Sequence, residues 1–238
     1  DGILTIEGKG AMDDFYTIKD WNTGEITESH PVPWEDDSFQ IMEVYIKDGV
    51  TRVGDRAFAD CYNLQKAVIG NSVKSLGQYA FANDGALTEL TIGNSVEAIE
   101  DDAFYGISIK KLVLPASLKS LSDEYTIPSH VTRIGSGAFC NTSLTKIVIP
   151  DTVKQIDEAA FEYSEMLTAI IFGKGITKIP DSCCYYDPAL STVEIPEGIT
   201  SIGSAAFWWC TSLKSVTLPS TVIKIKNSFE KTTSLTIQ

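Results

Sequence analysis

The chain has 238 residues, and 43% of them are hydrophobic, which is ample for one continuous core. Its formal net charge of -13 argues against nucleic acid and anionic membrane surfaces as partners, because both attract basic faces. No apolar run approaches the roughly 18 residues of a membrane span, so membrane insertion is not expected.

Residues 1–49 differ from the rest of the chain. Residues 2–8 alternate apolar and polar side chains like a strand, residues 41–46 also read as a strand, and residues 21–24, WNTG, are typical of a hairpin tip. We interpret this segment as an N-terminal cap, with Trp34 folded over the first coil. A structural role for Trp34 is favoured over a ligand-binding one.

From residue 50 onward, one segment of 22 or 23 residues recurs. Its pattern is clearest in residues 131–152, VTRIGSGAFCNTSLTKIVIPDT. The copies begin at Val50, Val73, Val96, Val131, Val153, Ile176 and Ile199, and a last one begins at Val222. Self-similarity at such a period predicts a repeat solenoid, a stack of coils in which each coil contacts its neighbours.

Each part of the repeat predicts a local structure. Residues 144–149 alternate buried and outward positions and predict a strand, so equivalent strands should form one parallel sheet along the stack. Gly135 indicates a turn, and Ser136 is a good N-cap for one helical turn that carries Ala138 and Phe139. The phenylalanines of successive coils should stack into one core.

One coil departs from the pattern. Only 13 residues separate its start at Leu118 from the next start at Val131, and the Gly, Ala and Phe positions are missing. Residues 125–128 should keep the strand, so we expect a gap on the helical side. A designed cleft and a tolerated deletion are both compatible with this pattern.

The five cysteines are predicted to be free thiols in the core. Cys61 and Cys210 occupy the same repeat slot six coil steps apart, roughly 29 Å at about 4.8 Å per step, which is far beyond disulfide reach. Cys183 and Cys184 replace the Ala and Phe of their coil, and Cys140 follows a core phenylalanine.

The pattern LxxIxIPxxVxxIGxxAFxxC is similar to the BspA-type leucine-rich repeat, over roughly residues 41–238. This resemblance implies a right-handed coil with a parallel β-sheet on one face and short helical turns on the other. It also implies a β-rich cap over residues 1–49, repeats over residues 50–238, and a secreted or cell-surface bacterial protein that acts in adhesion or protein binding. Fold alone does not establish function.

The chain carries no motif of a known catalytic or metal site. Its two histidines, His30 and His130, have no Cys or Asp at metal-ligand spacing, and no nucleophile-elbow, zinc-protease, phosphate-loop or dinucleotide pattern occurs. The acidic pairs at 13–14, 36–37, 101–102 and 123–124 lack the ordered alternation of a calcium loop. We therefore expect no enzyme activity, no cofactor and no metal.

Two surfaces are candidate binding sites. The sheet face carries the outward strand residues, and it could equally be an ordinary exposed sheet: Lys66, Val68, Glu89, Thr91, Lys111, Val113, Lys146, Val148, Ile171, Glu194 and Thr217. The aromatic edge consists of the rings that follow the core aromatic position: Tyr163, Tyr185, Tyr186, Trp208 and Trp209. Tyr163, Tyr186 and Trp209 should form a ladder, unless these rings cover the core instead.

We therefore expect a non-catalytic extracellular or cell-surface module that recognises a protein. The alternatives are a carbohydrate-binding module that uses the aromatic ladder and a passive surface spacer.

Overall fold

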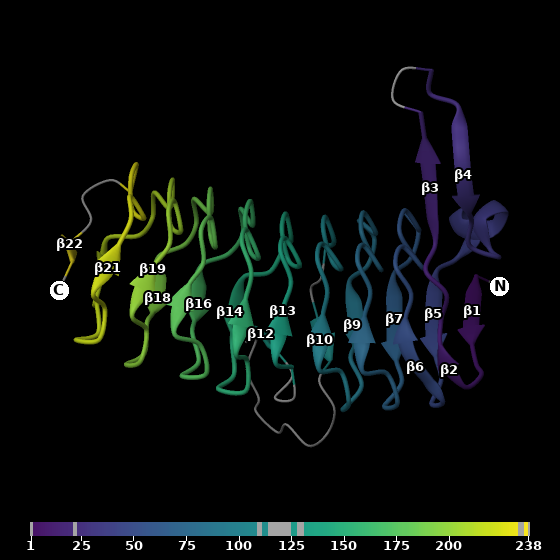
Figure 1. Ribbon diagram of the computed structural model, residues 1–238, viewed down its shortest axis with the longest axis horizontal. Coiled ribbons are helices and arrows are strands. Elements are labelled where there is room, and N and C mark those ends of the chain that lie inside the picture. The colour runs from purple at the N-terminus through teal and green to yellow at the C-terminus, as the bar shows by residue number, and fades with distance from the viewer. Residues whose placement is uncertain are drawn as a thin grey trace.

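The computed structural model describes residues 2–20, 23–108, 111–113, 125–127, 131–232 and 236–237. Its coils lie side by side along one axis, from the N-terminal cap to the C-terminal strand β22 (Figure 1). Every strand that pairs with the equivalent strand of another coil does so in parallel. The predicted fold class, a repeat solenoid with a parallel sheet, is confirmed.

The strand predicted from the repeat forms the first column of strands. Its members make up three sheets: β1 (Ile3–Ile6), β5 (Glu43–Ile46), β7 (Lys66–Ile69), β9 (Glu89–Thr91) and β11 (Lys111–Val113); then β12 (Tyr125–Thr126), β14 (Lys146–Val148), β16 (Ala169–Ile171) and β18 (Thr192–Glu194); then β20 (Ser215–Val216) and β22 (Thr236–Ile237). Among the described residues the expected single sheet is therefore divided into these three sections, although every pairing within them is parallel. The first interruption lies beside the irregular coil, where the period of the repeat is lost.

A second column of short strands lies on another face of the coils, and the sequence did not lead us to expect it. It contains a six-stranded sheet of β2 (Gly10–Ala11), β6 (Val50–Val53), β8 (Ser75–Leu76), β10 (Ala98–Ile99), β13 (Arg133–Ile134) and β15 (Gln155–Ile156), and a three-stranded sheet of β17 (Lys178–Ile179), β19 (Ser201–Ile202) and β21 (Lys224–Ile225). Proline explains the break between β15 and β17. Elsewhere the residue at this position donates its amide to the preceding coil, as Gly203 does to Ile179 at 2.9 Å, but Pro180 has no amide hydrogen.

The predicted helical turn is instead a third hydrogen-bonded column, which we call the turn column. Phe81 N donates to Ala103 O at 2.9 Å and Asn83 N donates to Tyr105 O at 2.8 Å, both in the next coil. Tyr79 and Asn83 are also left-handed, with φ of 55° and 65°. Alternate amides thus bond between coils, which is incompatible with an α-helix. In the described part of the chain, the only helix is the 3-10 helix η1 (Glu35–Gln40).

The N-cap slot predicted for Ser136 holds aspartate in other coils, as at Asp55 and Asp181, and these side chains act between coils. Asp55 Oδ1 accepts from Gln78 N at 2.8 Å, and Asp181 Oδ1 accepts from Ser204 N at 2.8 Å. Each carboxylate therefore satisfies a backbone amide of the following coil instead of an amide of its own turn. These acidic residues join neighbouring coils.

The buried phenylalanines form the predicted stack. Ring centroids are 5.1–5.7 Å apart from Phe58 through Phe81, Phe104 and Phe139 to Phe161. The step from Phe104 to Phe139 measures 5.5 Å, and β10 pairs directly with β13. The gap expected beside the irregular coil is therefore absent on this side, and that prediction is wrong. The extra residues add strand β12 to the first column, as predicted for residues 125–128, while Leu118 lies outside the described residues.

The N-terminal segment covers the first coil. The Trp34 ring stacks on Phe58 at 5.4 Å with an interplanar angle of 13°, and its Nε1 donates to Ala57 O at 3.1 Å. The structural role predicted for Trp34 is confirmed. Strands β3 (Tyr16–Lys19) and β4 (Ile26–His30) form an antiparallel hairpin that projects beyond the turn column (Figure 1). The predicted hairpin tip at 21–24 falls partly outside the described residues.

All five cysteines are buried free thiols, as their repeat slots predict. Burial raises the pKa of both Cys61 and Cys140 to about 12, so these thiols stay protonated and act as small apolar side chains. Cys184 occupies a phenylalanine slot and interrupts the ring stack, which resumes with Phe207 and Phe229 at 5.3 Å. No helix in the described ranges is long and apolar enough to span a membrane.

Candidate binding surfaces

The N-terminal half of the sheet face carries charges that neutralise one another. The pairing registers align Glu43, Lys66, Glu89 and Lys111 in a row of alternating sign. Lys66 Nζ lies 3.9 Å from Glu43 Oε2 and 5.4 Å from the centroid of the Tyr45 ring. Opposite charges on neighbouring strands stabilise a sheet, so this row has a structural role that is independent of any ligand.

The remaining sheet-face residues line shallow surfaces. Val68 and Thr91 are half-buried in the N-terminal half, and the side chains of Lys111 and Val113 lie outside the description. Towards the C-terminus, Lys146, Val148 and Ile171 are half-buried, and Glu194 and Thr217 are exposed. An open depression of about 520 Å³ runs along Val148, Ile171 and Glu194. The sheet face thus offers a partner a shallow surface of apolar and charged side chains.

The aromatic edge is a row of rings on the turn column. Ring centroids lie 5.7 Å apart between Tyr163 and Tyr186 and 6.0 Å apart between Tyr186 and Trp209. The three side chains are 43%, 39% and 41% exposed, so they do not cover the core. Tyr185 packs edge-on against Tyr163 at 5.6 Å, and both Tyr185 and Trp208 are half-buried. The predicted ladder is present in the structure.

The turn does not require aromatic residues at these positions. Tyr163, Tyr186 and Trp209 are all left-handed, with φ of 56°, 60° and 62°. The same slot in the other coils holds Asp60, Asn83, Gly106, Asn141 and Lys231. Glycine, asparagine and aspartate adopt this conformation most easily, whereas it costs other residues about 1–2 kcal/mol. Folding therefore favours glycine, asparagine or aspartate, which four of these five coils use, and the three rings need another explanation.

Two buried carboxyl groups lie behind the turn column. Asp187, next to Tyr186, accepts a hydrogen bond from Ser164 N at 2.8 Å, and Asp84 accepts one from Cys61 N at 2.9 Å. The second oxygen of each carboxyl has no partner among the described residues. Burial raises the pKa of both groups well above the usual value for aspartate. We did not predict these groups, although their slot also holds Cys61 and Cys210, which would have indicated burial.

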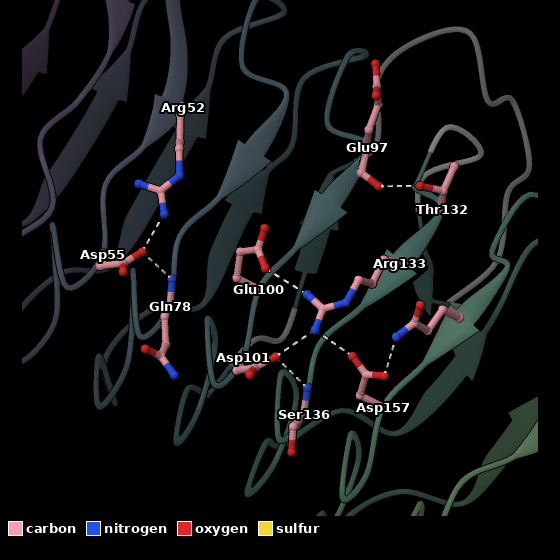
Figure 2. Close-up of polar contacts among 11 residues, drawn as sticks. Arg52, Asp55, Gln78, Glu97, Glu100, Asp101, Thr132, Arg133, Ser136 and Asp157 are labelled. Atoms are coloured by element: carbon pink, nitrogen blue, oxygen red, sulfur yellow. Dashed lines mark hydrogen bonds and ion pairs between the residues drawn. The ribbon is translucent and has the colours of Figure 1, made fainter.

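The acidic residues beside the second column neutralise Arg133 and cap backbone amides (Figure 2). Arg133 contacts Glu100 at 2.7 Å, Asp101 at 3.1 Å and Asp157 at 2.6 Å, and Asp101 also accepts from Ser136 N at 3.0 Å. This network joins three successive coils. No group of three or more His, Cys, Asp or Glu side chains within the described ranges could hold a metal ion.

The sequence profile of the BspA type leucine rich repeat region matches residues 36–125 and 121–236, with six copies. A leucine-rich repeat protein from Eubacterium ventriosum is 25% identical, with a TM-score of 0.62, and the match covers 99% of this chain and 68% of that one. A leucine-rich repeat protein from T. pallidum is 24% identical, with a TM-score of 0.63, and the match covers 72% of this chain and 78% of that one. Among curated proteins there is no match.

Proposed function

Because the chain belongs to the BspA-type leucine-rich repeat family, we propose that it is a non-catalytic binding module for a protein partner at the bacterial cell surface. The aromatic edge is its principal contact, and the sheet face is a secondary one. Leucine-rich repeats of this kind are generally binding modules, and their extended shape offers a long surface to a partner.

The observation that carries this proposal is the exposed row of Tyr163, Tyr186 and Trp209 in left-handed positions. Large exposed aromatic patches on soluble proteins mark interaction sites, and tyrosine and tryptophan are enriched among the residues that dominate binding energy. These rings also cost backbone energy, as their φ values show. Use as a binding surface accounts for both features, whereas a passive spacer accounts for neither.

The test replaces Tyr163, Tyr186 and Trp209 by asparagine, the residue that Asn83 and Asn141 place in the same slot. We expect the melting temperature to stay within a few degrees of the wild type, because asparagine suits the turn and the lost rings are exposed. Capture of proteins from host extracellular matrix should fall at least tenfold.

Tyr105→Ser is the matched control, since Tyr105 is an exposed ring on the same edge but is separate from the ladder contacts. It should leave capture unchanged. Equal capture by the wild type and the triple variant would contradict the aromatic edge as the contact. Failure of the wild type to capture any protein would contradict the protein-binding role itself.

Carbohydrate binding is the second candidate function, and the regular row of rings is the observation that favours it. Successive tilted rings suit the faces of sugar rings along a linear glycan. A glycan array probed with the wild type and the triple asparagine variant separates the two candidates. Binding of the wild type alone would assign the edge to a glycan, and no signal from either would leave the protein partner as the proposal.

A further inference from the structure

A second concave site lies at the other end of the solenoid, between the β3–β4 hairpin and the first coil. We call it the N-terminal cleft. It has a volume of about 480 Å³, with Tyr16 and His30 on the hairpin side and Phe39 and Tyr62 on the other. A cavity of this size with aromatic walls has the usual character of a ligand site. None of these residues belongs to the aromatic edge.

The rings of the cleft are held in place before any ligand arrives. Tyr62 Oη donates to Asp60 Oδ1 at 3.0 Å, and Tyr16 Oη donates to Glu28 Oε1 at 2.7 Å. Asn63 Nδ2 donates to Phe39 O at 2.7 Å, which ties the end of η1 to the first coil. Fixed side chains lower the entropy that binding must overcome, so the cleft is pre-organised.

Two of these rings are largely exposed to solvent. Phe39 is 63% exposed and Tyr62 is 50% exposed, and their centroids are 5.9 Å apart. They lie side by side, tilted by 34°. Together they offer a broad π surface to whatever enters the cleft, and the electron-rich faces of such rings attract cations.

The charges around the cleft also favour a cation. Glu35 and Asp60 belong to its lining, and Asp36 and Asp37 follow Glu35 in the first turn of η1. Arg56 lines the cleft as well, but its guanidinium lies 4.4 Å from the centroid of the Tyr79 ring in the next coil. The acidic side chains thus outnumber the basic one, in a chain whose net charge is -13.

We propose that the N-terminal cleft receives an arginine side chain of a partner protein. The guanidinium lies over the rings of Phe39 and Tyr62 and pairs with the carboxylate of Asp60, while Glu35 adds a second negative charge to the lining. Arginine fits both features of the cleft, because its planar guanidinium stacks on aromatic rings and donates in a fork to a carboxylate. A lysine ammonium is more strongly hydrated and stacks less well, and a neutral sugar would make no use of the acidic rim.

The test compares two probes that differ only in charge. N-acetyl-arginine amide is titrated into the ¹⁵N-labelled chain and followed by amide chemical shifts, and N-acetyl-citrulline amide serves as the neutral isostere. We expect the arginine probe to shift the amides of Asp60, Tyr62 and Asn63 and to bind about tenfold more tightly than the citrulline probe. N-acetyl-lysine amide should bind more weakly than the arginine probe.

Two variants test the named residues. Asp60→Asn preserves the left-handed backbone, because Asn83 adopts the same conformation in the next coil, and it should bring arginine binding close to that of citrulline. The double variant Phe39→Ala/Tyr62→Ala should abolish the shifts for both probes. Tyr163→Asn, on the aromatic edge, is the control and should bind arginine like the wild type.

Several outcomes would overturn the proposal. Equal affinity for the arginine and citrulline probes would show an apolar cleft without charge selectivity, and equal affinity for arginine and lysine would remove the assignment to arginine. Shifts that persist in the double aromatic variant would place the probe elsewhere. If the double variant loses its native spectrum, Asp60→Asn alone decides, and wild-type affinity in that variant would count against the proposal.

Discussion

Asp84 and Asp187 show how a repeat slot can place an ionisable group in a core. Their slot is buried from Cys61 to Cys210, and in the other coils of that range it holds cysteine, isoleucine, threonine or serine. One carboxyl oxygen of each satisfies a backbone amide of the preceding coil, while the other has no partner in the part of the chain that the structure describes. An unpaired buried oxygen is costly when charged, so burial favours the neutral carboxyl.

The raised pKa of Asp187 predicts how stability depends on pH. The folded state holds the proton to a higher pH than the unfolded state, whose pKa is near 3.8. The stabilising contribution of this group is therefore fully present below pH 3.8 and is lost as the pH rises to the folded-state pKa. Within that window the wild type should lose up to about 1.4 kcal/mol of unfolding free energy per pH unit through this group.

Asp187→Asn removes the titrating group and retains the acceptor for Ser164 N. Urea unfolding at pH 5 and pH 7.5 should show a smaller loss of stability with rising pH in this variant than in the wild type. Glu165→Gln, at an exposed position near the same edge, is the control and should keep the wild-type pH profile. Parallel profiles for Asp187→Asn and the wild type would contradict the assignment.

In the turn column, the local sequence predicts a different structure from the one observed. Ser136, Ala138 and Phe139 would suit one helical turn, yet their coil uses its amides to reach the next coil, as Phe139 N does to Ala160 O at 2.8 Å. Hydrogen bonds between coils repeat at every level of the stack and position one phenylalanine above the next. The residue before each phenylalanine of the stack is small, so neighbouring coils can approach closely and the rings can pack against one another.

Phe104→Ala is the test of that stack, since Phe104 lies between Phe81 and Phe139 and is fully buried. We expect a loss of about 3–5 kcal/mol in unfolding free energy, measured by denaturant titration, because the cavity interrupts contacts on both sides. Phe39→Ala removes an equally large ring that is exposed, so it should change stability by less than about 0.5 kcal/mol. Similar losses in the two variants would show that the stack contributes little.

At the scale of the whole molecule, the N-terminal cap shields the apolar face of the first coil from solvent. Trp34 covers the first ring of the stack, Phe58, and each coil contacts only its neighbours. In a stack of this kind, stability spreads from coil to coil, and an uncovered end opens first. The N-terminal segment also extends both strand columns, through the pairing of β1 with β5 and of β2 with β6.

Trp34→Ala should therefore destabilise the first coil locally. Amide hydrogen exchange should speed up by at least tenfold in residues 50–69, whereas protection around residues 199–216 should change little. Trp34→Phe keeps a stacked ring but loses the hydrogen bond to Ala57 O, so it should show an intermediate effect. A uniform loss of protection along the chain would mean that the solenoid unfolds as one unit.

Most of the fold could be predicted from the repeat period, because residues that occupy the same slot in successive coils share the same environment. It correctly predicted the parallel strands, the ring stack, the free cysteines and the ladder of Tyr163, Tyr186 and Trp209. It did not predict the second column, since a two-residue strand such as Arg133–Ile134 leaves almost no periodic signal. The N-terminal cleft was equally hidden, because the hairpin and η1 lie outside the repeat and meet the first coil only after folding.

The interruptions in the two strand columns fall at different levels of the stack. The first column is interrupted beside the irregular coil and between β18 and β20, while the second column is interrupted at Pro180. At each of these levels the other column continues. The second column bridges the irregular coil through β10–β13 and the gap between β18 and β20 through β17–β19, and the first column bridges the level of Pro180 through β16–β18. The hydrogen bonds of the turn column continue throughout. The interruptions of the two strand columns are thus staggered along the stack. A force that pulls the two ends apart must therefore break at least one strand pairing, in addition to the turn column, to separate any two neighbouring described coils.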